Sequence, residues 1–261
     1  MTDKIISRRE DGVGHVVFNN PDKRNAVSLD MWQAVDQALD RFAADEEIRA
    51  VVLSGAGGRA FVSGADVSKF EEERSGAEAV AHYNATTARI YAKLHTFAKP
   101  TIAQITGSCV GGGVALAVCC DLRICGQISR FGIPAAKLGL GYGFAGLQRL
   151  VHLIGPAFAK EMFFTARLFS AAEAYEMGLV NRVVPDDQVE GYVADYARTI
   201  SGNAPLTVGA VKAVVGEVLK DPAERDLARC ERLVQACFAS RDYVEGRQAF
   251  LEKRPPRFIG A

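Results

Sequence analysis

Three consecutive glycines, Gly111 to Gly113, begin the segment GGGVALA and point to chemistry carried by the backbone. Glycine suits places where the backbone must come close to another group, because it has no Cβ to obstruct the approach. The start of a helix also presents unpaired N–H groups at the positive end of the helix dipole. We therefore expect backbone amides here to bind an electron-rich ligand atom. The next side chains, Val114 and Ala115, offer neither an acid nor a base.

A second glycine turn, in FVSGADVSKF (residues 61–70), is placed to supply another backbone donor. Two N–H groups aimed at one oxygen make an oxyanion hole, and each donor is typically worth about 3 kcal/mol in a transition state. Sequence spacing alone does not bring the two turns to one point, so this prediction depends on the fold.

Charge and hydropathy exclude several classes of protein. The 261 residues carry 31 basic and 31 acidic side chains, with both signs scattered along the chain. This balance argues against a nucleic-acid partner, whose phosphates call for a basic face. No apolar run approaches the roughly eighteen residues that cross a membrane, and the polar N-terminus has no signal-peptide core. We expect a cytoplasmic protein without membrane contact.

The six cysteines and four histidines show no spacing typical of a disulfide framework or a metal site. No two cysteines form a C-x-x-C pair, and most lie in apolar surroundings such as LAVCCDL. We therefore expect small buried thiols and no bound metal.

Strands and helices alternate up to about residue 190. Apolar runs predict strands over residues 4–10, 14–19, 48–55, 100–107 and 121–125, the first two joined by the turn dipeptide Asp11-Gly12. Helical spacing predicts a helix capped by Ser28, with Met31, Val35, Leu39 and Phe42 on its apolar face, and another over residues 77–97. This order is typical of a parallel sheet covered by helices.

From Asp187 onward nearly every segment is predicted to be helical. We therefore divide the chain into an α/β core, residues 1–190, and a helical C-terminal region, residues 191–261. We expect that region to pack on the core or on a neighbouring subunit of a homo-oligomer.

A series of motifs in a fixed order resembles the crotonase family, the enoyl-CoA hydratase/isomerase group. They are NPDKRNAVSLDMW, AFVSGADVSKF, KPTIAQITGSCVGGGVALAVCCDLRI, FGIPAAKLGLGYG and AFLEKRPPRF. The resemblance covers nearly the whole chain. It implies the ClpP/crotonase-like α/β fold of repeated β-β-α units with a helical C-terminal region, assembly into trimers or hexamers, and an acyl-CoA substrate of fatty acid metabolism.

The resemblance also assigns site residues. In the family, the amides matching Ala65 and Gly112 bind the thioester carbonyl and stabilise the enolate. The residues implied to hold coenzyme A are Arg24, Ser63, Gly64, Ala65, Asp66, Val67, Ser68, Gly112, Pro134, Phe250 and Lys253. Arginine and lysine suit phosphates, and an aromatic side chain packs on adenine. No cofactor is implied beyond the coenzyme A moiety of the substrate.

The chain departs from the hydratase pattern at two positions. Family hydratases position and activate water with two glutamates, and the matching residues here are Ala115 and Ala135. Alanine supplies no general acid or base, which commonly contributes about two to four orders of magnitude in rate. Decarboxylation of a malonyl-type CoA ester needs an enolate but no side-chain base to start it. We therefore favour a decarboxylating lyase, with Tyr142 matching a catalytic tyrosine of the methylmalonyl-CoA decarboxylase branch.

That analogy is partial, and two alternatives stay open. The decarboxylase branch has histidine where this chain has Ala65, and its closest members retain the first glutamate. A hydratase or isomerase could use a relocated acid among Glu71 to Glu73. The chain could also bind acyl-CoA without converting it. We expect Asp121, at the end of the glycine-led helix, to be structural, and we expect no active role for Lys137.

Overall fold

Six strands form the larger of two sheets in the computed structural model, which describes residues 2–69, 73 and 75–261. Its strand order is β1 (Ile5–Glu10), β2 (Val13–Phe18), β3 (Ala50–Gly55), β5 (Thr101–Ile105), β7 (Leu122–Gly126) and β10 (Arg182–Val184). Neighbours are parallel except β1 and β2, which form a hairpin. Its turn residues, Asp11 and Gly12, have φ of 47° and 76°, as a tight hairpin requires. The predicted hairpin is confirmed.

The smaller sheet consists of four short strands, three of which follow a strand of the larger sheet. Its order is β4 (Ala60–Val62), β6 (Ser108–Val110), β8 (Arg130–Gly132) and β9 (Phe169–Ser170). β4 follows β3, β6 follows β5, β8 follows β7, and helical segments come after each pair. The repeated β-β-α units are thereby confirmed. Because β4, β6 and β8 are parallel neighbours, their C-terminal ends meet at one edge of the sheet.

Helices cover both sheets. They are α1 (Leu29–Ala44), α3 (Ala77–His95), α4 (Gly112–Ala117), α5 (Phe144–Thr165), α6 (Ala171–Glu176), α7 (Val189–Gly202), α8 (Pro205–Val218), α9 (Leu227–Ala239) and α10 (Arg241–Glu252). Single 3₁₀ turns are η1 (Pro21–Lys23), η2 (Val67–Lys69), η3 (Pro134–Leu138), η4 (Asp186–Gln188) and η5 (Pro222–Glu224). The predicted apolar face of α1 is buried. Ser28 is the N-cap residue, but its hydroxyl donates to Asp30 rather than accepting from the helix.

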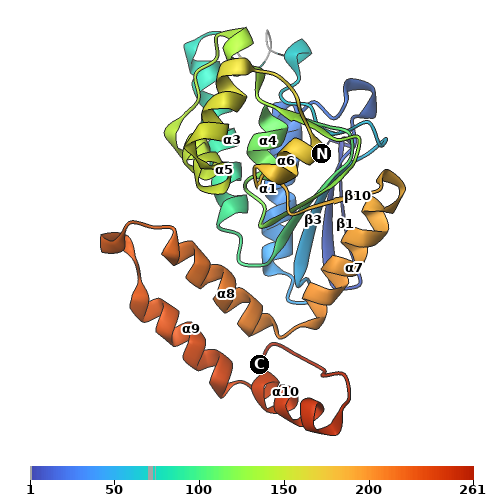
Figure 1. Cartoon of the computed structure of the whole chain (residues 1–261), viewed down its shortest axis with the longest axis vertical. Coiled ribbons are helices and arrows are strands. Elements are labelled where there is room, and N and C mark those ends of the chain that lie inside the picture. Colours follow the sequence, from blue (N-terminus) through green and yellow to red (C-terminus); the bar gives the residue numbers. More distant parts are fainter. Residues whose placement is uncertain (1, 70–72, 74) are drawn as a thin grey trace.

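Alternating residues of the larger sheet enter two different apolar clusters. Val51 and Leu53 of β3 belong to the main cluster with α1, α3 and α4. Val52 faces the other way and packs with Val193 and Ala197 of α7. Both faces of the sheet are therefore covered, as the period of two in a strand requires. Figure 1 shows α7 along the sheet and α8, α9 and α10 together at one end, away from the strands.

The cysteines are free thiols, and four of them are buried: Cys109, Cys119, Cys120 and Cys125. Burial raises the pKa of Cys119 to about 11 and that of Cys125 to about 12, so these thiols stay protonated and inert. Cys230 and Cys237 on α9 are partly exposed. No helix in the described ranges is long and apolar enough to cross a bilayer.

Candidate active site

The two glycine turns lie side by side at the common edge of β4 and β6. Gly64 and Ala65 follow β4, and Gly111 and Gly112 follow β6. A Cβ on Gly112 would lie 3.6 Å from the Cα of Gly64, so the two backbones are in van der Waals contact. The parallel pairing of two three-residue strands therefore brings together turns separated by almost fifty residues.

The N–H of Ala65 points away from Val27, whose backbone is hydrogen-bonded to the residues on either side of Ala65. Val27 donates its N–H to the carbonyl of Gly64 at 2.8 Å and accepts from the N–H of Asp66 at 3.0 Å. This is a parallel bridge centred on Ala65, so the N–H of Ala65 itself faces the opposite side. Within the described residues, no protein acceptor takes that N–H.

Among the residues that the structure describes, no acceptor takes the N–H of Gly112, because Gly112 is the first residue of α4, where no preceding turn supplies a carbonyl. Gly111 before it has φ 55° and ψ −114°, a conformation that glycine alone adopts readily, and its N–H donates to Gly132 at 2.8 Å. A Cβ on Gly113 would lie 2.0 Å from the carbonyl oxygen of Val62, so glycine lets α4 begin directly against β4. The three glycines thus aim a helix N-terminus at the edge where Ala65 lies.

A buried carboxylate holds the turn that carries Ala65. Asp66 accepts from the backbone N–H of Ser68 at 3.1 Å, from the Ser68 hydroxyl at 2.6 Å and from the Lys23 ammonium at 2.9 Å. Burial alone would raise the pKa of Asp66, but these partners together hold it below its ordinary value. The Asp66 side chain therefore fixes the backbone around Ala65.

Two residues implied to hold coenzyme A, Arg24 and Ser63, lie on neighbouring turns. The Ser63 hydroxyl donates to the backbone carbonyl of Lys23 at 3.4 Å, which places the η1 turn beside the Gly64 turn. Asn25 is fully buried and donates to the carbonyl of Ala60 at 2.7 Å. Arg24, between them, has φ 51° and an exposed side chain. This arrangement leaves a cation at the rim of the site.

Two apolar side chains that the sequence analysis assigned to the site lie in the buried core. Val114 and Ala135 are 1% and 4% exposed, and both belong to the main cluster, against which Ala65 and Tyr142 pack. Ala135 is reached from the third strand of the same edge, because β8 leads through Ile133 into η3. The positions matched to the hydratase glutamates therefore carry methyl groups.

Tyr142 packs edge-on against Phe163 of α5, with ring centroids 4.8 Å apart. Burial raises the pKa of its phenol above the ordinary value, so the group is neutral at physiological pH. The Tyr142 phenol therefore keeps its proton.

Tyr91 of α3 is a site residue that the sequence analysis did not single out. Its hydroxyl donates to the backbone carbonyl of Gly112 at 3.3 Å, and its ring packs edge-on against Trp32 with centroids 5.3 Å apart. The predicted helix over residues 77–97 contained it, but no short motif marks a contact made by helix packing.

The side chains considered for relocated acid or auxiliary roles have other surroundings. Glu73 accepts from the N–H of Leu29 at 2.9 Å and so caps α1. Glu71 and Glu72 lie outside the described residues. Asp121 accepts from the Thr101 hydroxyl at 2.9 Å and from Lys212 at 2.7 Å, which confirms its structural role. Lys137 has an exposed side chain.

Comparison with known proteins decides the family. The family model described as enoyl-CoA hydratase/isomerase matches residues 8–261. The chain belongs to the enoyl-CoA hydratase/isomerase family. It is 34% identical over 257 residues to crotonyl-CoA hydratase of Syntrophomonas wolfei, covering 98% of both chains. It is also 34% identical to short-chain-enoyl-CoA hydratase of Clostridium acetobutylicum, covering 96% of this chain and 95% of that one.

Solved structures agree with this assignment and with the crotonase fold. An enoyl-CoA hydratase/carnithine racemase from Magnetospirillum magneticum is 35% identical with a TM-score of 0.92, covering 100% of this chain and 97% of that chain. An enoyl-CoA hydratase from Bacillus anthracis is 31% identical with a TM-score of 0.93, and the match covers 99% of this chain and 100% of that chain.

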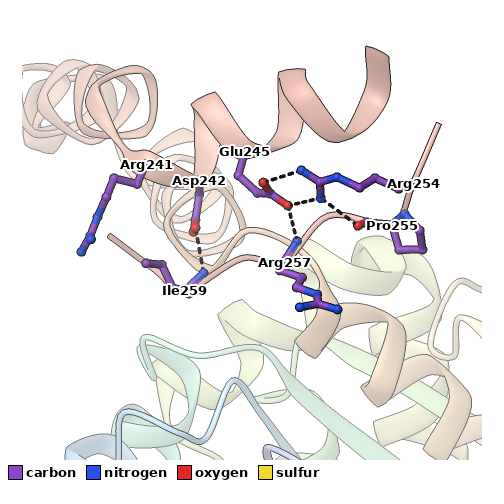
Figure 2. Close-up of a pocket in the computed structure, with 7 residues that line it drawn as sticks. All are labelled: Arg241, Asp242, Glu245, Arg254, Pro255, Arg257 and Ile259. Carbon is purple, nitrogen blue, oxygen red and sulfur yellow. Dashed lines mark hydrogen bonds and ion pairs between the residues drawn. The ribbon is translucent and has the colours of Figure 1, made fainter. Parts of the chain in front are cut away.

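Phe250 and Lys253, which the family resemblance implies to hold coenzyme A, do not join the site within one chain. Phe250 is 84% exposed on α10, and Lys253 ends that helix in a left-handed conformation with φ 55°. Figure 1 shows α10 at the far end of the molecule from α4. Figure 2 shows how the tail is fixed beside α10: Glu245 accepts from Arg254 at 2.6 Å and from the Arg257 N–H at 2.8 Å.

Proposed function

We propose that the protein binds an acyl-CoA thioester and stabilises its enolate on the amides of Ala65 and Gly112. The observation that carries this proposal is that the turns of Ala65 and Gly112 lie side by side at one sheet edge, and that neither N–H donates to an acceptor among the described residues. Each such donor lowers the barrier by about 3 kcal/mol when it meets the developing oxyanion. The N-terminus of α4 adds a positive dipole end at the same point.

The reaction that fits the surroundings best is decarboxylation of a malonyl-type CoA ester, a lyase reaction. The bond between the α-carbon and the carboxylate breaks, its electron pair enters the thioester to give the enolate, and carbon dioxide leaves. The α-carbon then takes a proton from Tyr142 or from water. Val114, Ala115 and Ala135 give the leaving carboxylate an apolar surrounding, which favours loss of its charge. The reaction needs no cofactor beyond the coenzyme A of the substrate.

Hydration of an enoyl-CoA is the second candidate, and the names of the relatives favour it. Hydration requires an acidic residue near the amides whose carboxylate activates water as a general base. Glu73 is engaged at the start of α1. A hydratase mechanism in this chain would therefore draw its acid from elsewhere, and Glu71 and Glu72 are the residues to test.

The test is a paired assay of the purified protein with methylmalonyl-CoA and with crotonyl-CoA. Release of carbon dioxide that falls in Tyr142→Phe supports the decarboxylase. Rapid loss of the enoyl absorbance, abolished by Glu71→Gln or Glu72→Gln, overturns it in favour of a hydratase. Tight binding of acyl-CoA with no turnover of either substrate supports the non-catalytic alternative.

A cytoplasmic homo-oligomer, a trimer or hexamer, completes the proposal. α8, α9 and α10 enclose a groove of about 900 Å³ whose apolar side chains include Val211, Val215 and Phe238, exposed by 58%, 53% and 61%. Apolar surface of this extent is typical of a protein interface. Such an assembly would let Phe250 and Lys253 of one subunit reach the coenzyme A of another.

A further inference from the structure

Tyr91 touches the residue that supplies one of the two oxyanion donors. Its hydroxyl lies 3.3 Å from the carbonyl oxygen of Gly112 and 3.3 Å from the place that a Cβ on Gly112 would occupy. The Cα of Gly64 lies 3.6 Å from the same place. The phenol of α3 and the turn that carries Ala65 therefore both adjoin Gly112.

The phenol of Tyr91 is itself held by buried aromatic side chains. Its ring meets Trp32 of α1 at an interplanar angle of 82°. Trp32 is 2% exposed, and its indole N–H donates to the hydroxyl of Tyr83 at 3.2 Å. Edge-to-face packing of this kind fixes ring orientation. The Tyr91 hydroxyl thus approaches α4 from a rigid support.

Gly112 needs such support because glycine has a wide range of accessible backbone conformations. Its amide contributes fully only if it points at the position that the oxyanion will occupy. The hydrogen bond from Tyr91 fixes the carbonyl side of Gly112, while the bond from Gly111 to Gly132 fixes the preceding residue. The two bonds restrain the donor from both sides.

We propose that Tyr91 is a positioning residue that holds the Gly112 amide in its enolate-binding orientation. The inference rests on the proposed function, since it presupposes that this amide meets an enolate oxygen. A net hydrogen bond between neutral groups is worth about 1 kcal/mol, or about fivefold. Tyr91→Phe removes that bond and keeps the ring on Trp32. We expect it to weaken enolate stabilisation by about fivefold and to leave ground-state binding unchanged.

The experiment compares two ligands by calorimetry, so it needs no turnover. The enolate mimic is 2-nitropropionyl-CoA, whose acidic α-carbon ionises and shares its negative charge between the nitro group and the thioester oxygen. The ground-state comparator is butyryl-CoA. In Tyr91→Phe we expect the affinity for the nitro compound to fall about fivefold, with the affinity for butyryl-CoA within twofold of wild type. Tyr196→Phe, which removes a phenol hydroxyl from α7 on the other face of the larger sheet, is the matched control and should leave the ratio of the two affinities unchanged.

Three results would overturn the inference, and one of them concerns the proposed function as well. Equal loss of affinity for both ligands in Tyr91→Phe would mean a merely structural role. Unchanged affinity for both ligands would mean that the hydroxyl does not orient the donor. A wild-type protein that binds the nitro compound no better than butyryl-CoA would contradict enolate stabilisation itself. That third result is read from the wild type alone, so the two failures are distinguishable.

Discussion

Ala115 and Ala135 bring methyl groups to the two positions matched to the hydratase glutamates. Ala135 is 4% exposed, and Ala115 is partly buried on the first turns of α4. In the proposed reaction, a carboxylate at position 135 would face the carboxylate of a malonyl-type substrate, and like charges at short range in an apolar site repel strongly. The proposed choice of reaction therefore depends most on Ala135.

Ala135→Glu should slow release of carbon dioxide from methylmalonyl-CoA by at least about tenfold, because each tenfold requires only about 1.4 kcal/mol of repulsion. Ala135→Gln is the matched control, since glutamine has nearly the same size without the charge. Initial rates for both variants at neutral pH provide the measurement. Equal rates in the two variants would show that charge at position 135 is irrelevant.

Tyr142→Phe should lower the rate of carbon dioxide release by about a hundredfold, the usual contribution of a proton donor. Burial raises the pKa of Tyr142, so the neutral phenol persists through neutral and mildly alkaline pH. The wild-type kcat should accordingly show no alkaline decline below the ordinary phenol pKa of about 10. A decline at lower pH that disappears in Tyr142→Phe would contradict this assignment.

Among the elements, those with strong periodicity were predictable, and the short strands were not. The helices α1 and α3 and the β1–β2 hairpin follow from apolar spacing and a turn dipeptide. β4, β6 and β8 have three residues each, and their pairing partners lie far along the chain. The two glycine turns were therefore identifiable separately, while their meeting depends on the register between β4 and β6.

The contacts of Asp66 with Lys23 and Ser68, here called the clasp, could not be predicted either, because Lys23 lies 43 residues away from Asp66 in the sequence. Asp66→Asn should weaken this clasp. The folded pKa of Asp66 lies below the ordinary value of 3.8, so the ionised side chain stabilises the fold above that pH and loses this effect as pH falls through the folded pKa. We expect wild type to lose about 1 kcal/mol more stability than the variant as the pH falls below the ordinary pKa of 3.8.

Urea unfolding at a series of pH values measures this difference. Asp22→Asn, an exposed carboxylate on η1, is the control and should follow wild type. Parallel curves for wild type and Asp66→Asn would show that the clasp contributes nothing to stability.

On the scale of the whole molecule, the exposed apolar groove of α8, α9 and α10 predicts association. Phe238→Asp places a charge in that groove and should reduce the trimer or hexamer to smaller species, because burying an unpaired charge is costly. Arg232→Asp, on the same helix with a 67% exposed side chain, should leave the assembly intact. Sedimentation velocity distinguishes these results, and a monomeric wild type would refute the predicted assembly.

The most direct test of the central claim follows the carbon atoms themselves. Methylmalonyl-CoA labelled with carbon-13 in its free carboxylate is incubated with the protein in deuterated water and observed by NMR. We predict that the label appears as carbon dioxide and bicarbonate while the propionyl-CoA product gains one deuterium at the α-carbon. That pattern requires an enolate formed by loss of the carboxylate. Retention of the label in the CoA ester, together with rapid hydration of crotonyl-CoA by the same preparation, would contradict the account.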